Sequence, residues 1–571
     1  MTISDRTDAL LRALTVLRER VASLRFPLEL EDVAEARRGR REVVAQLDDY
    51  VLPRIVSLEA PLLAVVGGST GAGKSTLVNA IIGRQVTQTG VLRPTTRAPV
   101  LVCHPDDVDW FNTDRILPDL VRRDPDHTAG PGELYLITDE AVPSGLALLD
   151  APDIDSVVVE NRVLSAQLLA AADLWIFLTT AARYADAVPW DFLLDAAQRS
   201  AAIAVVLNRV TVEAVAEVRH HLATMLDSRG LGDSPMFIVE ETPLGHDRML
   251  PTEQVAPIVA WLQNLSASAE GRSEIVRRTL DGAIGDLTRR TPPLAAASDL
   301  QAATGDHLRT LAVTAYDDAL ISIDRASRNG SMLRGEVLAR WQDFVGTGEF
   351  FRSLEERVGK IRDRIETYLR GKTQRAEAVE NAISHGLEAL FVGEADSASE
   401  RVATSWQGDM AGKVLLGKDD LSRSSPDFGE RAAAEIAQWQ AALFEMVKTE
   451  GQDRRSTARF MSFGVNGIAV ALMVTVFAST GGLTGAEVGI AGGTAVVGQR
   501  LLEAIFGDDA VRRMAESARK DLNHRAETLL SGELVRFTER IDVLAIEPNA
   551  SAAVRQALAD VERTRLLERD L

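Results

Sequence analysis

The clearest chemical feature of the sequence is a candidate phosphate-binding loop. From Gly68 to Ser75 the spacing is G-x-x-x-x-G-K-S, between an apolar run, 62–66, and a helical run, 76–82. Glycines let successive backbone N–H groups turn toward a polyphosphate, and the N-terminus of the next helix adds positive potential. A glycine-rich turn is the alternative, but the complete pattern favours a nucleotide site. The residues expected to bind the nucleotide here are Gly68, Ser69, Thr70, Gly71, Ala72, Gly73, Lys74, Ser75 and Thr76.

Two side chains of this loop suit the chemistry of a triphosphate. The Lys74 ammonium would reach the β- and γ-phosphates and stabilise the charge that is transferred. The Ser75 hydroxyl would ligate Mg²⁺. We therefore predict a catalytic role for Lys74 and a Mg²⁺ cofactor.

Three further stretches could complete the site, and each stands beside the end of a predicted strand. Thr96, in the loop 93–99, is placed to close on the Mg²⁺ and the γ-phosphate, as a switch loop does. Asp150 ends the apolar run 146–149 and would hold the metal through water. Asn208 and Arg209 end another apolar run, where a loop could contact the base. Each stretch alone could be an ordinary loop, turn or strand end, but together and in this order they favour a GTPase.

The elements that would position these residues alternate between short apolar runs and helical stretches. Besides 62–66, buried strands are expected at 100–102, 146–149, 174–178, 203–207 and 236–239. This alternation predicts an α/β fold with a mostly parallel sheet. Ligands of such sheets bind at the carboxyl ends of the strands, where the phosphate-binding loop also lies.

The rest of the chain reads as helical. Leucines and valines at helical spacing fill 10–24, and this small arm should pack on a segment that is distant in sequence. After residue 294 the only prolines are Pro426 and Pro548. The predicted fold class is an α/β P-loop GTPase domain followed by a long all-α stalk and neck with a hydrophobic helical hairpin. The predicted divisions are an N-terminal helical arm (1–60), a P-loop GTPase domain (61–268), a helical stalk or trunk (269–455), a hydrophobic hairpin (456–507) and returning C-terminal helices (508–571).

The hairpin has two readings. Residues 460–486 are uncharged, enough to cross a bilayer core as one helix, and a second apolar run follows Glu487. Arginines flank it on both sides, which favours both ends staying in the cytosol. A hairpin in contact with membrane lipid fits this pattern, and a hairpin buried in the core of a helical bundle is the alternative.

Composition narrows the compartment and the partners. The net charge of −20 argues against nucleic acid as a partner, because neutralising phosphates requires a basic face. Cys103 is the only cysteine, so no intrachain disulfide can form and a reducing cytosol is expected. The first residues carry charges and no apolar core, so we expect no signal peptide. Together with the hairpin, this predicts a location on the cytoplasmic side of the cell membrane, bound peripherally or inserted by the hairpin.

Several motifs resemble those of the dynamin superfamily, and of bacterial dynamin-like GTPases of actinobacterial type in particular. The run from Gly73 to Gly83 looks like the first motif of translation-factor-related GTPases. Thr96-Arg97-Ala98-Pro99 is similar to the switch I signature T-R-x-P, and Asp150-Ala151-Pro152 resembles the D-x-P start of switch II. The resemblance implies a neck bundle, a trunk with a membrane-binding tip, and GTP-dependent pairing of heads. It further implies homo-oligomers joined through heads and stalk, membrane remodelling, and a paired dynamin-like partner.

Three departures from the family pattern affect the expected activity. Asp153 stands where the D-x-P-G pattern has glycine. Thr211 stands where T/N-K-x-D has the carboxylate that reads guanine. Thr70 and Gly71 take the place of the Gln-Ser that positions water in animal dynamins, so Thr70 is the candidate for that role. Slow or partner-dependent hydrolysis follows from these changes.

Three hypotheses therefore stand. The first is a membrane-associated GTPase that hydrolyses GTP to GDP and phosphate. The second is a nucleotide-dependent membrane scaffold with little hydrolysis, which the altered motifs favour. The third is an ATPase subunit of a transporter, which lacks support because the sequence has no L-S-G-G-Q signature and only one apolar hairpin.

Overall fold

The structure is a computed structural model that describes most of the chain. The described residues are 3–87, 98–113, 115–124, 130, 132–156, 159–198, 202–244, 248–329, 331–333, 335–345, 373–452, 465–478, 498–500, 502–503 and 505–569. They separate into two compact units. Unit 1 holds Met1–Phe26, Asp32–Leu300 and Glu547–Leu571, and unit 2 holds Pro27–Glu31 and Gln301–Ile546.

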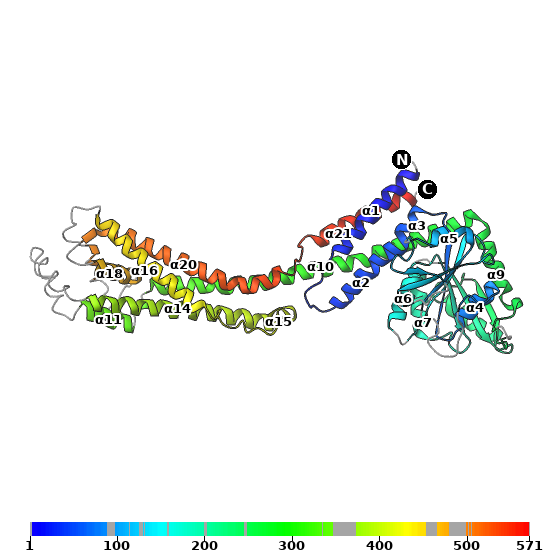
Figure 1. Cartoon of the computed structure of the whole chain (residues 1–571), viewed down its shortest axis with the longest axis horizontal. Coiled ribbons are helices and arrows are strands. Elements are labelled where there is room, and N and C mark those ends of the chain that lie inside the picture. Colours follow the sequence, from blue (N-terminus) through cyan, green and yellow to red (C-terminus); the bar gives the residue numbers. More distant parts are fainter. Residues whose placement is uncertain are drawn as a thin grey trace, which may run out of the picture. The chain divides into compact units, whose positions relative to one another are not determined.

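An eight-stranded sheet forms the centre of unit 1 (Figure 1). Its order is β3-β4-β2-β5-β1-β6-β7-β8, and every pairing is parallel except β2 with β5. The strands are β1 (Leu62–Gly68), β2 (Val100–Cys103), β3 (Val121–Arg123), β4 (Glu133–Thr138), β5 (Leu146–Asp150), β6 (Leu174–Thr180), β7 (Ala202–Val210) and β8 (Met236–Glu240). The six strands expected from apolar runs are confirmed, and the mostly parallel α/β fold with them.

Helices cover both faces of this sheet, because alternate residues of the strands are apolar on both sides. Leu62 and Ala64 of β1 pack with α4 (Lys74–Ile82) and α9 (Thr252–Ala267). Leu63 and Val65 face the side where side chains of α6 (Val159–Ala170), α7 (Ala187–Gln198) and α8 (Val215–Asp227) join the core. The short elements η2 (Pro105–Asp107) and α5 (Val108–Phe111) follow β2.

The N-terminal arm packs on the end of the chain. It consists of α1 (Ile3–Ser23), α2 (Val33–Gln46), the π-helical η1 (Leu47–Val51) and α3 (Leu52–Val56). On α1, the side chains of Leu10, Leu14, Leu17 and Val21 stand at helical spacing and are 0–1% exposed, and Leu24 just after the helix is buried as well. Helix α1 lies along α21 (Ala550–Arg569), which confirms that the arm packs on a segment distant in sequence (Figure 1).

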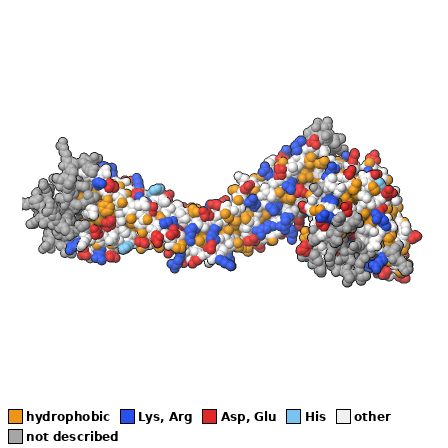
Figure 2. All heavy atoms as spheres, in the orientation of Figure 1, with side chains coloured by type: hydrophobic (Ala, Val, Ile, Leu, Met, Phe, Trp, Pro, Cys, Tyr) orange, Lys and Arg blue, Asp and Glu red, His pale blue; other side chains and the backbone are white. Residues whose placement is uncertain are grey.

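Unit 2 is a helical bundle with one continuous hydrophobic core. Its long helices α14 (Thr373–Gln407), α16 (Phe428–Gln452) and α20 (Asp508–Asp542) lie side by side (Figure 1). Helix α10 (Ala269–Arg328) contributes residues to both units. The shorter elements are η3 (Ser331–Leu333), α11 (Glu336–Val345), α15 (Met410–Leu416) and α18 (Val465–Ala478). On the face drawn in Figure 2, acidic and basic side chains are interspersed along the helices.

Most of helix α18, which belongs to the predicted hydrophobic hairpin, is buried in the core of unit 2. On α18, Ile468 to Phe477 are 0–2% exposed, and the helix contacts α14, α16 and α20. A helix that is apolar on every side either lies inside a protein or contacts lipid, and here α18 lies inside the bundle. The flanking parts of the hairpin, 456–464 and 479–497, fall outside the described residues. Among the helices that the structure describes, none is both long and apolar enough to cross a bilayer.

Candidate functional site

The phosphate-binding loop connects the end of β1 to the start of α4, as the sequence predicts. Gly73 has φ +100°, and a Cβ atom there would lie 2.7 Å from Nδ2 of Asn208. Gly68 approaches the neighbouring strand so closely that a Cβ atom would lie 2.0 Å from the carbonyl oxygen of Leu178. Both positions therefore need glycine, one for its backbone conformation and the other for space.

Lys74 begins α4 and points back into the loop. Its side chain is 5% exposed. The Nζ atom donates to the carbonyl oxygens of Gly68 at 2.9 Å and Ser69 at 3.2 Å. It also forms an ion pair with Asp153. The ammonium therefore lies at the mouth of the loop, where the sequence places it, but with a carboxylate against it.

Ser75 and Asp150 meet directly below the loop. The Ser75 hydroxyl donates to Oδ2 of Asp150 at 2.6 Å. Asp150 is fully buried, and burial raises its pKa to about 6 even though the Ser75 hydrogen bond and the charge of Lys74 lower it. Among the described residues, Oδ1 of Asp150 and the buried hydroxyl of Ser69 have no hydrogen-bond partner.

These oxygens fit a Mg²⁺ ion held together with a nucleotide. A hydroxyl and a carboxylate are hard oxygen ligands, and Mg²⁺ in such sites takes its other ligands from phosphates and water. In the part of the chain that the structure describes, no group of three or more His, Cys, Asp or Glu residues could hold a metal. Ser75 and Asp150, two of the three predicted metal-binding residues, are brought together.

Thr70, the candidate for positioning water, is fixed by a carboxylate that the sequence reasoning missed. Its N–H and hydroxyl donate to Oδ1 of Asp155 at 2.6 and 2.8 Å. Arg183 donates to Oδ2 of Asp155 at 2.6 Å and to the Thr70 carbonyl oxygen at 3.1 Å. Asp155 follows β5 and Arg183 follows β6, so the criterion that selected Asn208, a polar residue near the end of an apolar run, could have found both.

Asn208 supports the loop from the side. Its Nδ2 donates to the carbonyl oxygen of Ala72 at 2.7 Å, and its Oδ1 accepts from the Arg209 N–H at 2.9 Å. The Asn208 side chain is buried, whereas Arg209 is exposed. The structure thus brings Asn208 to the phosphate-binding loop, with both ends of its amide engaged by the protein.

Comparison with known proteins gives a family match for the part of the chain around this loop. Residues 63–129, which include this loop, match the sequence model described as the dynamin family. The fold and the loop agree with that match. This part of the chain is therefore similar to the dynamin family.

Solved structures and curated proteins were compared as well. One structure is described as an oligomerised bacterial dynamin pair for long-range sensing and tethering of membranes. Its sequence is 11% identical to this chain, and the TM-score is 0.36. The match covers 98% of this chain and 95% of that chain. A second structure is LeoA, a bacterial dynamin GTPase from ETEC, with 12% sequence identity and a TM-score of 0.24. The match covers 99% of this chain and 97% of that chain. No curated protein matches the chain. At these TM-scores the structures add no argument, so the likeness to dynamins rests on the family model and the loop.

Thr96, the predicted switch I threonine, lies outside the described residues. The segment that leads toward it is held by Asn79 of α4. Oδ1 of Asn79 accepts from the N–H groups of Val86 at 2.8 Å and Thr87 at 2.9 Å, and Nδ2 donates to the Thr87 carbonyl oxygen at 3.0 Å. Asn79 was not among the predicted site residues.

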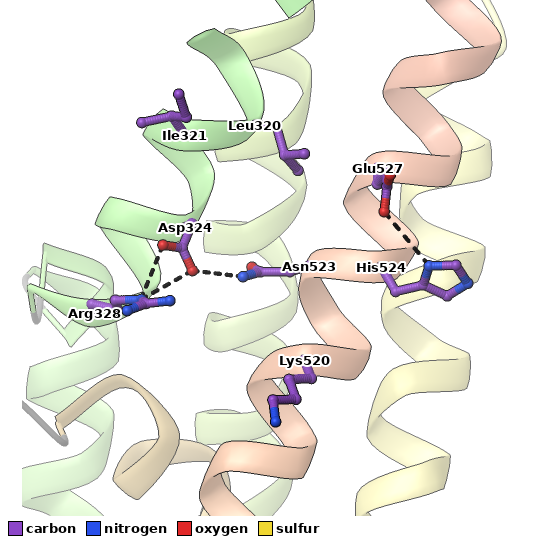
Figure 3. A pocket seen from close by; sticks show the side chains of 8 residues that line it. All are labelled: Leu320, Ile321, Asp324, Arg328, Lys520, Asn523, His524 and Glu527. Atoms are coloured by element: carbon purple, nitrogen blue, oxygen red, sulfur yellow. Dashed lines mark hydrogen bonds and ion pairs between the residues drawn. The ribbon is translucent and has the colours of Figure 1, made fainter. Parts of the chain in front are cut away.

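Unit 2 carries a hollow of about 390 Å³ between α10 and α20 (Figure 3). Its charged side chains are paired with one another or with neighbours. Asp324 accepts from Arg328 at 3.0 Å and from Asn523 at 2.5 Å. Lys520 pairs with Glu516 at 2.9 Å. The phosphate-binding loop is the better candidate site, because it combines the complete sequence pattern with the Ser75–Asp150 pair.

Proposed function

We propose that this chain is a dynamin-like GTPase that uses GTP binding and hydrolysis to drive self-assembly and membrane remodelling. The observation that carries the proposal is the meeting of Lys74, Ser75 and the buried Asp150 at one phosphate-binding loop. In a nucleotide-binding protein these three groups contact phosphate and Mg²⁺. Residues 68–76, together with Asn208 and Arg209, are the proposed nucleotide-binding residues.

The roles of the chain's own residues follow from their contacts. Lys74 would stabilise negative charge on the β- and γ-phosphates, and Ser75, Asp150 and Thr96 would hold the metal. When bound, Mg²⁺ neutralises charge on the transferring phosphoryl group. Thr70, held in place by Asp155, would position water. Because hydrolysis of this type depends on positioning and charge, small shifts of these groups would control the rate.

We further propose that membrane lipid is contacted, from the cytoplasmic side of the membrane, by the parts of the segment 456–507 that lie outside the buried helix α18. The uncharged run there extends well beyond α18, and basic residues flank it. The proposal includes the domain boundaries at residues 60, 268, 455 and 507. It also includes homo-oligomers formed through heads and stalk, and a paired dynamin-like partner.

The burial of α18 decides how the membrane segment should be tested. Charges at Val470 or Val476, both 0% exposed, would disrupt the core of unit 2 itself. Leu483→Glu and Ile490→Glu change the same apolar stretch outside the described helix. Val535→Glu, at a side chain 44% exposed on α20, is the matched control.

The experiment combines vesicle flotation with phosphate release. We expect the wild-type chain to float with vesicles of anionic lipid and to release phosphate from GTP. The Leu483→Glu/Ile490→Glu variant should stay unbound, whereas Val535→Glu should float. No phosphate release and no flotation by the wild-type chain would contradict the proposal.

A nucleotide-dependent scaffold with little hydrolysis is the second candidate. Asp153 on Lys74 and the absence of a carboxylate at Thr211 favour it, because both depart from residues that active GTPases use. A single-turnover measurement separates the two candidates. Nucleotide binding without phosphate release supports the scaffold, and release in step with binding supports the GTPase.

A further inference from the structure

The hydrogen-bonding capacity of the Lys74 ammonium is used up within the protein. Nζ donates to the carbonyl oxygens of Gly68 and Ser69 at 2.9 and 3.2 Å, and its third partner is the carboxylate of Asp153. An ammonium group has three protons, so these partners leave none for a phosphate. Lys74 is 5% exposed and Asp153 22% exposed, so solvent screens their attraction only partly.

The loop that carries Asp153 is fastened to the phosphate-binding loop on either side of it. Before it, Asp150 accepts from the Ser75 hydroxyl at 2.6 Å. After it, Asp155 accepts from the N–H and the hydroxyl of Thr70 at 2.6 and 2.8 Å. Asp153 is therefore held at the mouth of the loop by contacts other than its own.

We infer that Asp153 competes with the nucleotide's phosphates for Lys74, and so lowers the affinity of the site for nucleotide. This inference rests on the nucleotide-binding function proposed above. A carboxylate and a phosphate present the same acceptor, a negatively charged oxygen, and the third proton of Lys74 serves one of them at a time. The measured affinity is then the intrinsic affinity multiplied by the fraction of molecules in which Asp153 has left Lys74.

This competition predicts which ligands Asp153 affects. Asp153 acts on the phosphate end of the ligand, so its effect should not depend on the base. GTP, GDP and inorganic tripolyphosphate should all be weakened by the same factor. Because the ion pair must open before the ligand binds, the effect should appear in the association rate.

The test measures binding of these three ligands to the full chain and its variants. Asp153→Asn keeps the shape of the side chain and removes its charge, and Asp153→Gly removes the side chain and serves if the first variant does not fold. Asp109→Asn removes an exposed charge from α5 in the same unit and is the matched control. We expect both Asp153 variants to bind all three ligands about ten-fold more tightly, with the gain in the association rate, and the control to bind as wild type.

The outcomes separate failure of this inference from failure of the proposed function. If the wild-type chain binds nucleotide and the Asp153 variants bind it equally or more weakly, the competition is wrong and the nucleotide function stands. A gain confined to GTP would also contradict it, because Asp153 would then sense the γ-phosphate alone. If neither wild type nor variants bind any of the three ligands, the proposed function fails, and this inference fails with it.

Discussion

The buried ion pair between Arg54 and Asp173 tests how the α/β sheet is attached to the N-terminal arm. Arg54 lies on α3 and is 1% exposed, and Asp173 directly precedes β6 and is 0% exposed. Oδ2 of Asp173 also accepts from the Leu63 N–H at 2.7 Å, on the strand that leads to the phosphate-binding loop. Burial raises the pKa of Asp173 although Arg54 lowers it, so the cost of desolvation outweighs the attraction.

The magnitude follows from which groups lose their partners. Asp173→Ala leaves the buried guanidinium of Arg54 without its carboxylate and should lower the free energy of unfolding by about 3–5 kcal/mol. In the double variant Arg54→Met/Asp173→Leu no charge remains to be buried. Because desolvation dominates this pair, the double variant should recover most of the loss.

Cys103 supplies an assay that reports on the sheet alone. It is the only cysteine of the chain, it is fully buried in β2, and burial raises its pKa to about 12. The thiol should therefore resist a brief pulse of thiol reagent at pH 8 until the sheet unfolds. For a urea dependence of about 2–3 kcal/mol per molar, the labelling midpoint of Asp173→Ala should fall by about 1–2.5 M.

The control is Asp106→Ala, which removes a carboxylate that is 78% exposed and should change stability by less than about 0.5 kcal/mol. An unchanged midpoint for Asp173→Ala would refute the reasoning. So would a double variant as unstable as the single one, because the loss would then come from packing and not from an unpaired charge.

Three further predictions concern single side chains. Burial raises the pKa of Asp150 to about 6, so its carboxyl group is mostly protonated below pH 6. Mg²⁺-dependent nucleotide binding, measured by titration, should therefore weaken about ten-fold for each pH unit below 6. In Asp150→Asn this pH dependence should be lost. Asn208→Ala removes the 2.7 Å hydrogen bond to the Ala72 carbonyl oxygen and should weaken nucleotide binding about ten-fold in equilibrium titrations without lowering the melting temperature of unit 2. Gln301→Ala removes hydrogen bonds of 2.8 and 2.9 Å to the N–H and carbonyl groups of buried Leu28. The free energy of unfolding, measured by denaturant unfolding followed by circular dichroism, should fall by about 1–3 kcal/mol. An unchanged transition would show that water replaces the amide.

The buried strands and the phosphate-binding loop could be predicted because their signals are local. The apolar runs of β1, β5, β6 and β7 are buried along their whole described length or nearly so, and such runs are recognisable in the sequence. Strand β3 was not predicted, because its three residues, two of them exposed, are Val-Arg-Arg at the edge of the sheet. A short edge strand has neither an apolar run nor a clear alternation.

The contacts that complete the site could not be predicted, because they join residues far apart in the chain. Arg54 and Asp173 are separated by 119 residues, and Arg183 and Thr70 by 113. The sequence identified Asp153 as a departure from the family motif, but its ion pair with Lys74 is visible only in the fold. The uncharged run at 460–486 allowed both a buried and a membrane-bound helix, because hydropathy does not distinguish a protein core from lipid.

The most direct test of the account is equilibrium binding of labelled GTP, in the presence of Mg²⁺, to the wild-type chain and to Lys74→Ala, with unlabelled GTP and ATP as competitors. The account predicts saturable binding by the wild-type chain, displacement by GTP at lower concentration than by ATP, and no binding by Lys74→Ala. Equal binding by both proteins, or no saturable binding by either, would contradict it.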